Sequence, residues 1–303
     1  MIANMRVLLL MWLMVLMLAC SSTLGVDMTG VDVAAPNSEP FAKNAKLEVI
    51  ATGFGLAEGP VWYRNQLLVS DIPANTVFAF SSMNQKTVFQ KPANNANGHR
   101  LDAQGRLLQA EHGRQITRLE SDGARTVLAS RFEGKRLNSP NDLIVHSSGS
   151  IYFTDPTWGL GDSSQSELGF TGIYKISNGT LTLLNKTLEQ PNGLAFSRDQ
   201  KTLYVSDATN TIRAFAVLAN GDLAAPRDFA KGNDGLLVDA QGRVWAANGG
   251  VSVYGTDGKL ISSIAKPGSK DVTNLAFGGA DDKTLFVTTF DGVYKLQTQT
   301  TGN

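Results

Sequence analysis

The chain has 303 residues, of which 42% are hydrophobic, so it is long enough to bury a large core. Its 27 basic and 27 acidic residues give a net charge of zero, which provides no overall field to attract nucleic acid or an anionic membrane. The 30 glycines, about a tenth of the chain, indicate many tight turns and favour an all-β fold.

The N-terminal residues 1–19 have the features of an export signal. Arg6 precedes an apolar run, residues 7–18, that is short for a membrane span. Small residues before Cys20 resemble the lipobox of bacterial lipoproteins, in which the cysteine is lipidated after cleavage. We therefore expect a signal peptide of the lipoprotein type, and a protein exported to the bacterial periplasm or held at a membrane only by a lipid anchor on Cys20. Ordinary cleavage nearby, without lipid, is the open alternative.

Residues 20–45 are small, polar and contain proline, which predicts a flexible tether. Cys20 is the only cysteine in the chain. A disulfide or a thiolate metal site within the mature domain is therefore excluded. We expect that domain to be a monomer.

From residue 46 onward one pattern recurs six times. Each copy begins with a polar residue before an apolar strand, turns at Asp, Gly or Asn, and returns through a second apolar strand. The leading polar residues are spaced 39 to 51 residues apart, a period typical of a four-stranded propeller blade. These residues are Glu58, Asn97, Asn141, Asn192, Asp234 and Asn274.

The repeats predict one six-bladed β-propeller with four-stranded blades over residues 46–299, followed by a short tail, 300–303. No segment of it carries a sustained helical period. The last copy lacks a convincing fourth strand, whereas residues 47–50 precede the first copy and have no other assignment. We expect this N-terminal strand to pair with the blade that contains Tyr294 and to close the ring, which removes a free sheet edge.

The leading polar residues are predicted to meet at one mouth of the central channel, because the first strand of each propeller blade lines that channel. An unpaired buried polar group costs roughly 1–3 kcal/mol. Carboxylate and amide oxygens without thiolates suit a hard cation. We therefore predict one divalent cation, Ca²⁺ first and Zn²⁺, Mn²⁺ or Mg²⁺ as alternatives, with charge from Glu58 and Asp234 and neutral oxygens from Asn141 and Asn192. Hydrogen bonding within blade turns is the structural alternative, which we favour for Asn274.

Five motifs occur together along the repeats. They are AEGPVW (57–62), EHG (111–113), SPNDLIV (139–145), QPNGLAFS (190–197) and DGLLVDAQGRVW (234–245). In order and spacing they resemble the senescence marker protein and gluconolactonase family, which includes regucalcin and the bacterial sugar-lactone lactonases. The resemblance covers nearly all of residues 46–299.

The resemblance implies a propeller that holds a divalent ion through Glu58, Asn192 and Asp234, with Asn141 as a substrate or metal contact. It also implies that lactones of sugar acids are the substrates and that Asp234 is the usual proposal for the catalytic acid or base. Animal members place an arginine where this chain has Ser139, so the identity of the substrate stays open.

We expect a divalent-metal-dependent hydrolase that opens a lactone ring. The ion would stabilise the developing oxyanion, and a carboxylate would take the proton of the attacking water. Asp234 is the first candidate for this catalytic base and Asp207 the second. Asp155 and His112 are expected to contact the substrate. Trp158 either forms an apolar wall for the ring or packs in the core or a loop.

Two other functional classes stay open. The first is a metal-dependent aryl esterase or phosphotriesterase, and the second is a non-catalytic propeller that binds calcium or carbohydrate. The intact set of Glu58, Asn192 and Asp234 argues against the second, because a protein that had lost catalysis would be expected to lose one of them. No Gly-x-Ser-x-Gly motif is present, so a serine nucleophile is not expected.

Overall fold

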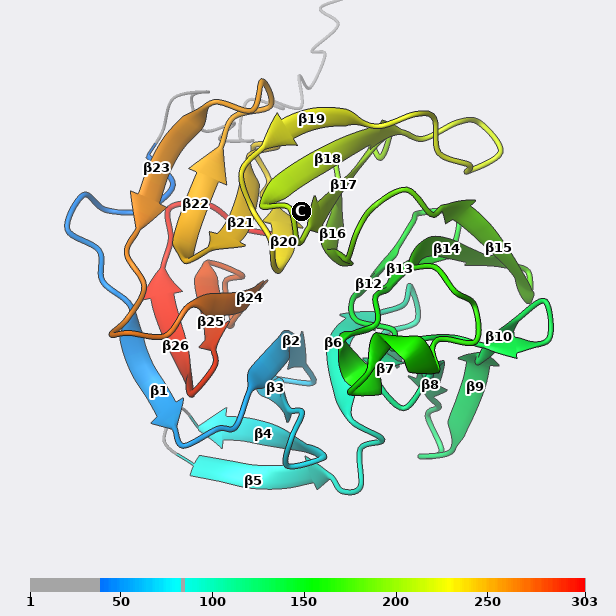
Figure 1. Ribbon diagram of the computed structural model, residues 1–303. Coiled ribbons are helices and arrows are strands. Elements are labelled where there is room, and N and C mark those ends of the chain that lie inside the picture. Colours follow the sequence, from blue (N-terminus) through cyan, green and yellow to red (C-terminus); the bar gives the residue numbers. More distant parts are fainter. Residues whose placement is uncertain (1–38, 83–84, 303) are drawn as a thin grey trace, which may run out of the picture. The chain divides into compact units, whose positions relative to one another are not determined.

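The computed structural model describes residues 39–82 and 85–302, which form six sheets of four antiparallel strands. The sheets stand around a common centre as the blades of a propeller (Figure 1). The predicted all-β, six-bladed architecture is confirmed. The described residues contain no α-helix and only two short 3₁₀ turns, η1 (Trp158–Leu160) and η2 (Ser163–Gln165). Neither turn is long and apolar enough to cross a membrane.

The first three blades follow one another along the chain, each from its inner to its outer strand. Blade 1 consists of β2 (Ala57–Tyr63), β3 (Gln66–Asp71), β4 (Thr76–Ser82) and β5 (Gln85–Gln90). Blade 2 consists of β6 (Ala96–Leu101), β7 (Leu107–Glu111), β8 (Gln115–Leu119) and β9 (Arg125–Ala129). A small hairpin then leads to blade 3 through β10 (Arg131–Phe132) and β11 (Lys135–Arg136). Blade 3 consists of β12 (Leu143–Val145), β13 (Ile151–Asp155), β14 (Gly172–Ser177) and β15 (Thr180–Asn185).

The remaining blades complete the ring. Blade 4 consists of β16 (Pro191–Phe196), β17 (Thr202–Asp207), β18 (Thr211–Ala216) and β19 (Arg227–Ala230). Blade 5 consists of β20 (Leu236–Val238), β21 (Val244–Asn248), β22 (Gly250–Tyr254) and β23 (Leu260–Ile264). Blade 6 consists of β24 (Val272–Gly278), β25 (Thr284–Thr289), β26 (Gly292–Gln297) and β1 (Glu48–Thr52). Strand β1 lies antiparallel to β26 with Glu48 opposite Lys295, so the predicted closure by an N-terminal strand is confirmed.

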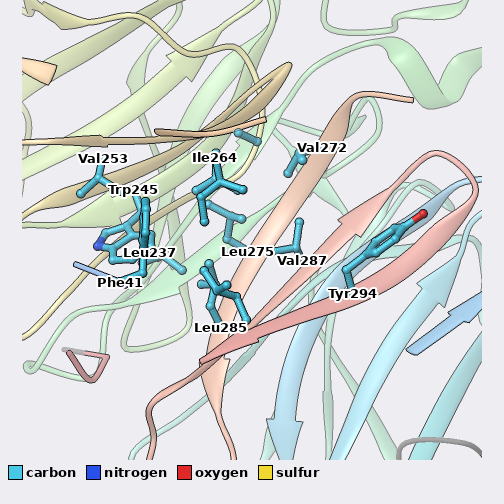
Figure 2. Close-up of a cluster of buried hydrophobic side chains, with 13 residues drawn as sticks. Phe41, Leu237, Trp245, Val253, Ile264, Val272, Leu275, Leu285, Val287 and Tyr294 are labelled. Carbon is cyan, nitrogen blue, oxygen red and sulfur yellow. The ribbon is translucent and has the colours of Figure 1, made fainter. Parts of the chain in front are cut away.

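The hydrophobic core lies between neighbouring blades. Figure 2 shows one such layer, in which Leu237 and Trp245 of blade 5 pack with Leu275 and Leu285 of blade 6. Trp245, Leu275 and Leu285 are fully buried. Burial of each large apolar side chain stabilises the fold by roughly 1.5–3 kcal/mol. The blades are therefore held in fixed positions relative to one another, and the residues at the channel mouth are fixed with them.

The packed part of the chain extends beyond the predicted limits of 46–299. Phe41, within the predicted tether, is buried against Trp245 with the ring centres 5.9 Å apart. At the other end Thr300 is buried and Gly302 pairs with Asp239, within the predicted tail. The predicted signal peptide and Cys20 lie outside the described residues, as do residues 21–38.

Glycines bring neighbouring inner strands close together around the channel. They follow the leading polar residue in four blades, at Gly59, Gly98, Gly193 and Gly235. A Cβ atom on Gly98 would lie 2.5 Å from Asp142 Oδ1 of the next blade, and one on Gly235 would lie 2.2 Å from Asn274 Oδ1. Because only glycine allows this approach, the inner strands of these four blades lie close to the start of the inner strand of the next blade.

Candidate metal and substrate site

The starts of the inner strands enclose a cavity of about 340 Å³. Five of the six leading polar residues line it, namely Glu58, Asn97, Asn141, Asn192 and Asp234. The sixth, Asn274, is buried and donates from Nδ2 to Glu58 Oε2 over 3.0 Å. The structure therefore gathers the residues that sequence reasoning expected at one mouth, and it gives Asn274 a structural hydrogen bond.

Glu58 is held by one of its two carboxylate oxygens. Gly59 N also donates to Oε2, over 2.9 Å, whereas Oε1 has no hydrogen-bond partner among the described residues. Gly59 has a φ of 51°, and a Cβ there would lie 1.9 Å from the Asn97 carbonyl oxygen, so the position requires glycine. Burial raises the pKa of Glu58 to about 7, and the negative charge of Asp142 adds to the rise.

Asn192 of blade 4 and Asp234 of blade 5 form a second unit. Asn192 Nδ2 donates to Asp234 Oδ1 over 2.8 Å and to the Asn233 carbonyl oxygen over 3.1 Å. Its amide oxygen has no hydrogen-bond partner within residues 39–82 and 85–302. Burial raises the pKa of Asp234, and the nearby charge of Glu58 raises it further. Two carboxylates thus repel each other in one cavity that no Lys or Arg lines.

Asn141, Asn97 and His112 complete the polar part of the cavity. The side chain of Asn141 has no hydrogen-bond partner in the described part of the chain, although Asn141 lines the cavity. Asn97 Nδ2 lies 3.1 Å from His112 Nε2, and the buried Asn97 Oδ1 has no partner. Burial lowers the pKa of His112 to about 4, so this imidazole is neutral at pH 7. Asn141 and His112, both predicted substrate contacts, are therefore brought to the cavity.

Asp155, predicted as a substrate contact, and Asp207, predicted as the second candidate for the base, are not among the residues that line the cavity. Both are buried at the ends of second strands. Asp155 Oδ2 accepts from Asn138 N over 2.8 Å, and Asp207 Oδ1 accepts from Gln190 N over 2.8 Å. Each carboxylate therefore fixes the loop that leads into the inner strand of its own blade.

The residue before each of these aspartates has a matching structural role. Thr154 Oγ1 donates to the Asn192 carbonyl oxygen over 2.7 Å, and Ser206 Oγ donates to the Asp234 carbonyl oxygen over 2.7 Å. Both bonds join a second strand to the inner strand of the next blade. The recurrence of Ser or Thr followed by Asp in several blades was therefore the signal of a repeated structural device.

Asp142 is an acidic residue near the site that was not among the predicted metal, catalytic or substrate residues. It is 1% exposed, and its Oδ2 atom has no hydrogen-bond partner among the described side chains and backbone. Burial raises the pKa of Asp142, and the charge of Asp142 in turn raises the pKa values of Glu58 and Asp234. Its position directly after Asn141 in the SPNDLIV motif is the sequence signal that could have identified it.

The rim of the cavity is apolar. It is lined by Leu56, Ile72, Trp158, Ala208 and Phe290. Trp158 and Phe290 remain 44% and 45% exposed, so their rings are available to a ligand. Phe290 lies in the turn between β25 and β26 and carries no motif, which is why sequence reasoning missed it.

Ser139 holds the segment that carries Trp158. Its hydroxyl donates to the Pro156 carbonyl oxygen over 2.6 Å and accepts from Gly159 N over 3.0 Å. A Cβ on Gly159 would lie 2.6 Å from His112 Cγ, so this segment packs directly against the imidazole. Ser139 therefore fixes the segment that brings Trp158 to the rim of the cavity.

The donor set fits a hard divalent cation. The described residues contain no group of three or more His, Cys, Asp or Glu side chains that could hold a metal ion. The cavity instead offers two carboxylates and several amides, with unpaired oxygens on Glu58 and Asn192. A doubly charged ion would neutralise Glu58 and Asp234. Their raised pKa values show that burial without a counter-charge disfavours the ionised carboxylates.

Comparison with known proteins places the chain in a family. The model of the SMP-30/Gluconolactonase/LRE-like region matches residues 56–291. The chain belongs to this family. The predicted resemblance is thereby confirmed, and the matched range begins just before β2 and ends between β25 and β26.

Several members of the SMP-30/gluconolactonase family resemble this chain over most of its length. The chain is 33% identical to a gluconolactonase of Zymomonas mobilis, over 84% of this chain and 82% of that protein. It is 26% identical to a pentonolactonase of Haloferax volcanii, over 80% and 84%. The solved structure of a gluconolactonase from Xanthomonas campestris has a TM-score of 0.77 and 36% identity, and the match covers 86% of this chain and 91% of that one.

Proposed function

We propose that the protein is a lactonase that hydrolyses lactones of sugar acids with the help of a divalent cation. The observation that carries this proposal is the single cavity that joins Glu58, Asn192 and Asp234 in a chain of this family. Relatives named gluconolactonase and pentonolactonase support the reaction class.

Glu58, Asn192 and Asp234 would hold the ion, with Asn141 as a further contact to the ion or the substrate. Ca²⁺ is the first candidate because the donors are oxygens only, and Zn²⁺, Mn²⁺ and Mg²⁺ are alternatives. When bound, a divalent cation supplies a Lewis acid that polarises the lactone carbonyl.

The protein's own groups would bind the ring and move the proton. Asn141 and the pair formed by Asn97 and His112 supply hydrogen bonds to ring hydroxyls, while Trp158 covers the apolar face of the ring. Asp234 would accept the proton of the attacking water and return it to the ring oxygen as the carbon–oxygen bond of the lactone breaks. The hydrogen bond from Asn192 to Asp234 Oδ1 orients this carboxylate for the transfer.

A second candidate is an aryl esterase or phosphotriesterase, which the exposed aromatic rim favours. The experiment that decides is hydrolysis by purified protein of glucono-1,5-lactone, an aryl ester and a phosphotriester, each before and after chelation. Lactone turnover that chelation abolishes and added metal restores supports the proposal. No turnover of any substrate with Ca²⁺, Zn²⁺, Mn²⁺ or Mg²⁺ would leave the non-catalytic binding propeller as the function.

We also propose that residues 1–19 direct export and that Cys20 carries a lipid. The order of charge, apolar run and small residues before Cys20 supports this proposal. When bacterial cells are grown with labelled palmitate, the label should appear in the purified full-length protein and not in its Cys20→Ser variant. Equal labelling of the two would exclude the anchor.

A further inference from the structure

A second cavity of about 340 Å³ lies at the other mouth of the channel, and we name it the distal cavity. It is lined by residues near the ends of the six inner strands, whereas the candidate site is built at their starts. Its wall is mainly apolar and includes Trp62, Phe196, Ala276 and Phe277. A volume of this size falls in the range of small-molecule pockets, roughly 300–1,000 Å³.

Three polar side chains interrupt this apolar wall, and two of them have backbone partners. Gln200 Oε1 accepts from Ser147 N over 2.8 Å, and Asp282 Oδ2 accepts from Gly302 N over 3.1 Å. The third is Arg100. Its guanidinium makes one hydrogen bond, from Nη1 to the carbonyl oxygen of the preceding residue over 3.3 Å.

Arg100 forms no ion pair within 4.0 Å in the part of the chain that the structure describes. Its charge lowers the pKa of Asp142 from a distance, yet burial still leaves that pKa raised. Two arginines in the turns that follow inner strands are paired, since Arg106 bonds to Asp102 and Arg243 bonds to Asp239. A half-buried guanidinium with most of its donors unused, beside apolar walls, is suited to bind an anionic group.

The surroundings of Arg100 also limit the charge of that anion. Arg100 is the one cation among the described residues that line the distal cavity, and Asp282 is an acid at the same cavity. A doubly charged phosphate would therefore be only half neutralised by Arg100, and Asp282 would repel it more strongly than it repels a singly charged anion. A carboxylate carries one negative charge and matches the planar fork of a guanidinium.

We propose that the distal cavity binds a small monocarboxylate with an apolar body, whose carboxylate pairs with Arg100. The apolar part of the ligand packs against Trp62, Phe196 and Phe277 within the ring of inner strands. This site is separate from the proposed lactonase site, so the proposal does not depend on the enzymatic function.

Calorimetric titration with sodium octanoate and with 1-octanol tests the proposal. The wild type should bind octanoate at least tenfold more tightly than the alcohol. Arg100→Met, which removes the charge and retains an apolar stem, should weaken octanoate binding roughly tenfold to a hundredfold and leave the alcohol unaffected. Arg100→Lys should retain part of the affinity. The matched control is Arg227→Met on the outer strand β19, which should bind octanoate as the wild type does.

Several results would overturn the proposal. Equal affinity for octanoate and 1-octanol, or no binding of octanoate, would show that Arg100 attracts no carboxylate. Binding that survives in Arg100→Met and disappears in Trp158→Ala would place octanoate in the other cavity. If Arg100→Met does not fold, Ala276→Leu, which fills part of the distal cavity, must abolish octanoate binding for the proposal to stand.

Discussion

The two mouths of the channel are built from the same six strands and enclose cavities of equal size, yet their chemistry is opposite. Where the strands begin, acids and amides are pressed together by glycines and by hydrogen bonds from the neighbouring blade. Where the strands end, apolar side chains fill the ring around one arginine. In blades 3 and 4 the loop before the inner strand is held by a buried aspartate, Asp155 or Asp207, so the polar residues at the start of that strand do not have to hold the loop themselves. The rest of each strand must supply the core.

The largest difference between the two mouths should appear in catalysis. We expect Asp234→Asn to lower kcat for lactone hydrolysis about 1,000-fold, because it removes both an ion ligand and the proposed base. Glu58→Gln should lose a similar factor through loss of the ion. Trp62→Phe, at the distal mouth, changes no charge and should hydrolyse lactones at the wild-type rate. Steady-state rates at saturating metal measure this effect, and activity of Asp234→Asn within tenfold of wild type would contradict the assignment.

The acids of the candidate site should also make the metal-free protein sensitive to pH. Burial raises the pKa of Glu58 from 4.5 to about 7, so the folded state binds the proton more tightly than the unfolded state. The contribution of Glu58 to stability is therefore complete below pH 4.5 and is lost as the pH rises towards 7. The loss is on the order of 3 kcal/mol.

The test of this pH effect is the difference between two proteins. His99 and His112, with pKa values lowered to about 4, change stability in the opposite direction over part of the same range. We therefore compare denaturant unfolding of the wild type and Glu58→Gln in the presence of a chelator, from pH 4 to pH 8. The variant should gain stability relative to the wild type as the pH rises. If the difference in unfolding free energy between the two proteins does not change with pH, the pKa of Glu58 is not raised in the folded state.

A smaller effect is expected for the acids that fix loops. Asp207→Ala leaves the backbone N–H groups of Glu189 and Gln190 without their acceptor, which should cost roughly 1–3 kcal/mol of unfolding free energy. Below the melting range its kcat for lactones should remain within about threefold of wild type. Asp155→Ala is the matched variant in blade 3 and should behave in the same way. A loss of kcat in Asp207→Ala as large as that in Asp234→Asn would restore Asp207 as a catalytic base.

The ring and its closure could be predicted because the repeat sets both the number of blades and the position of each inner strand. The same spacing placed Glu58, Asn192 and Asp234 at one mouth, since a leading residue has the same location in every blade. The repeat spacing could not show that the aspartates at the ends of the second strands lie outside the cavity. Asp207 and its equivalents carry the same charge as a catalytic acid, and only their backbone partners show that they serve the loops.

The smallest effect should distinguish the aromatic residues of the two mouths. Trp158 is 44% exposed at the rim of the candidate site, so Trp158→Ala should remove about 50 Å² of apolar contact with a bound lactone. That corresponds to about 1 kcal/mol, or a fivefold rise in KM, with kcat little changed. Trp62→Phe, at the distal mouth, keeps an aromatic ring beside Phe286 and should leave KM unaltered. If both variants raise KM by the same factor, the rings act through the stability of the propeller, and the aromatic rim does not contact the substrate.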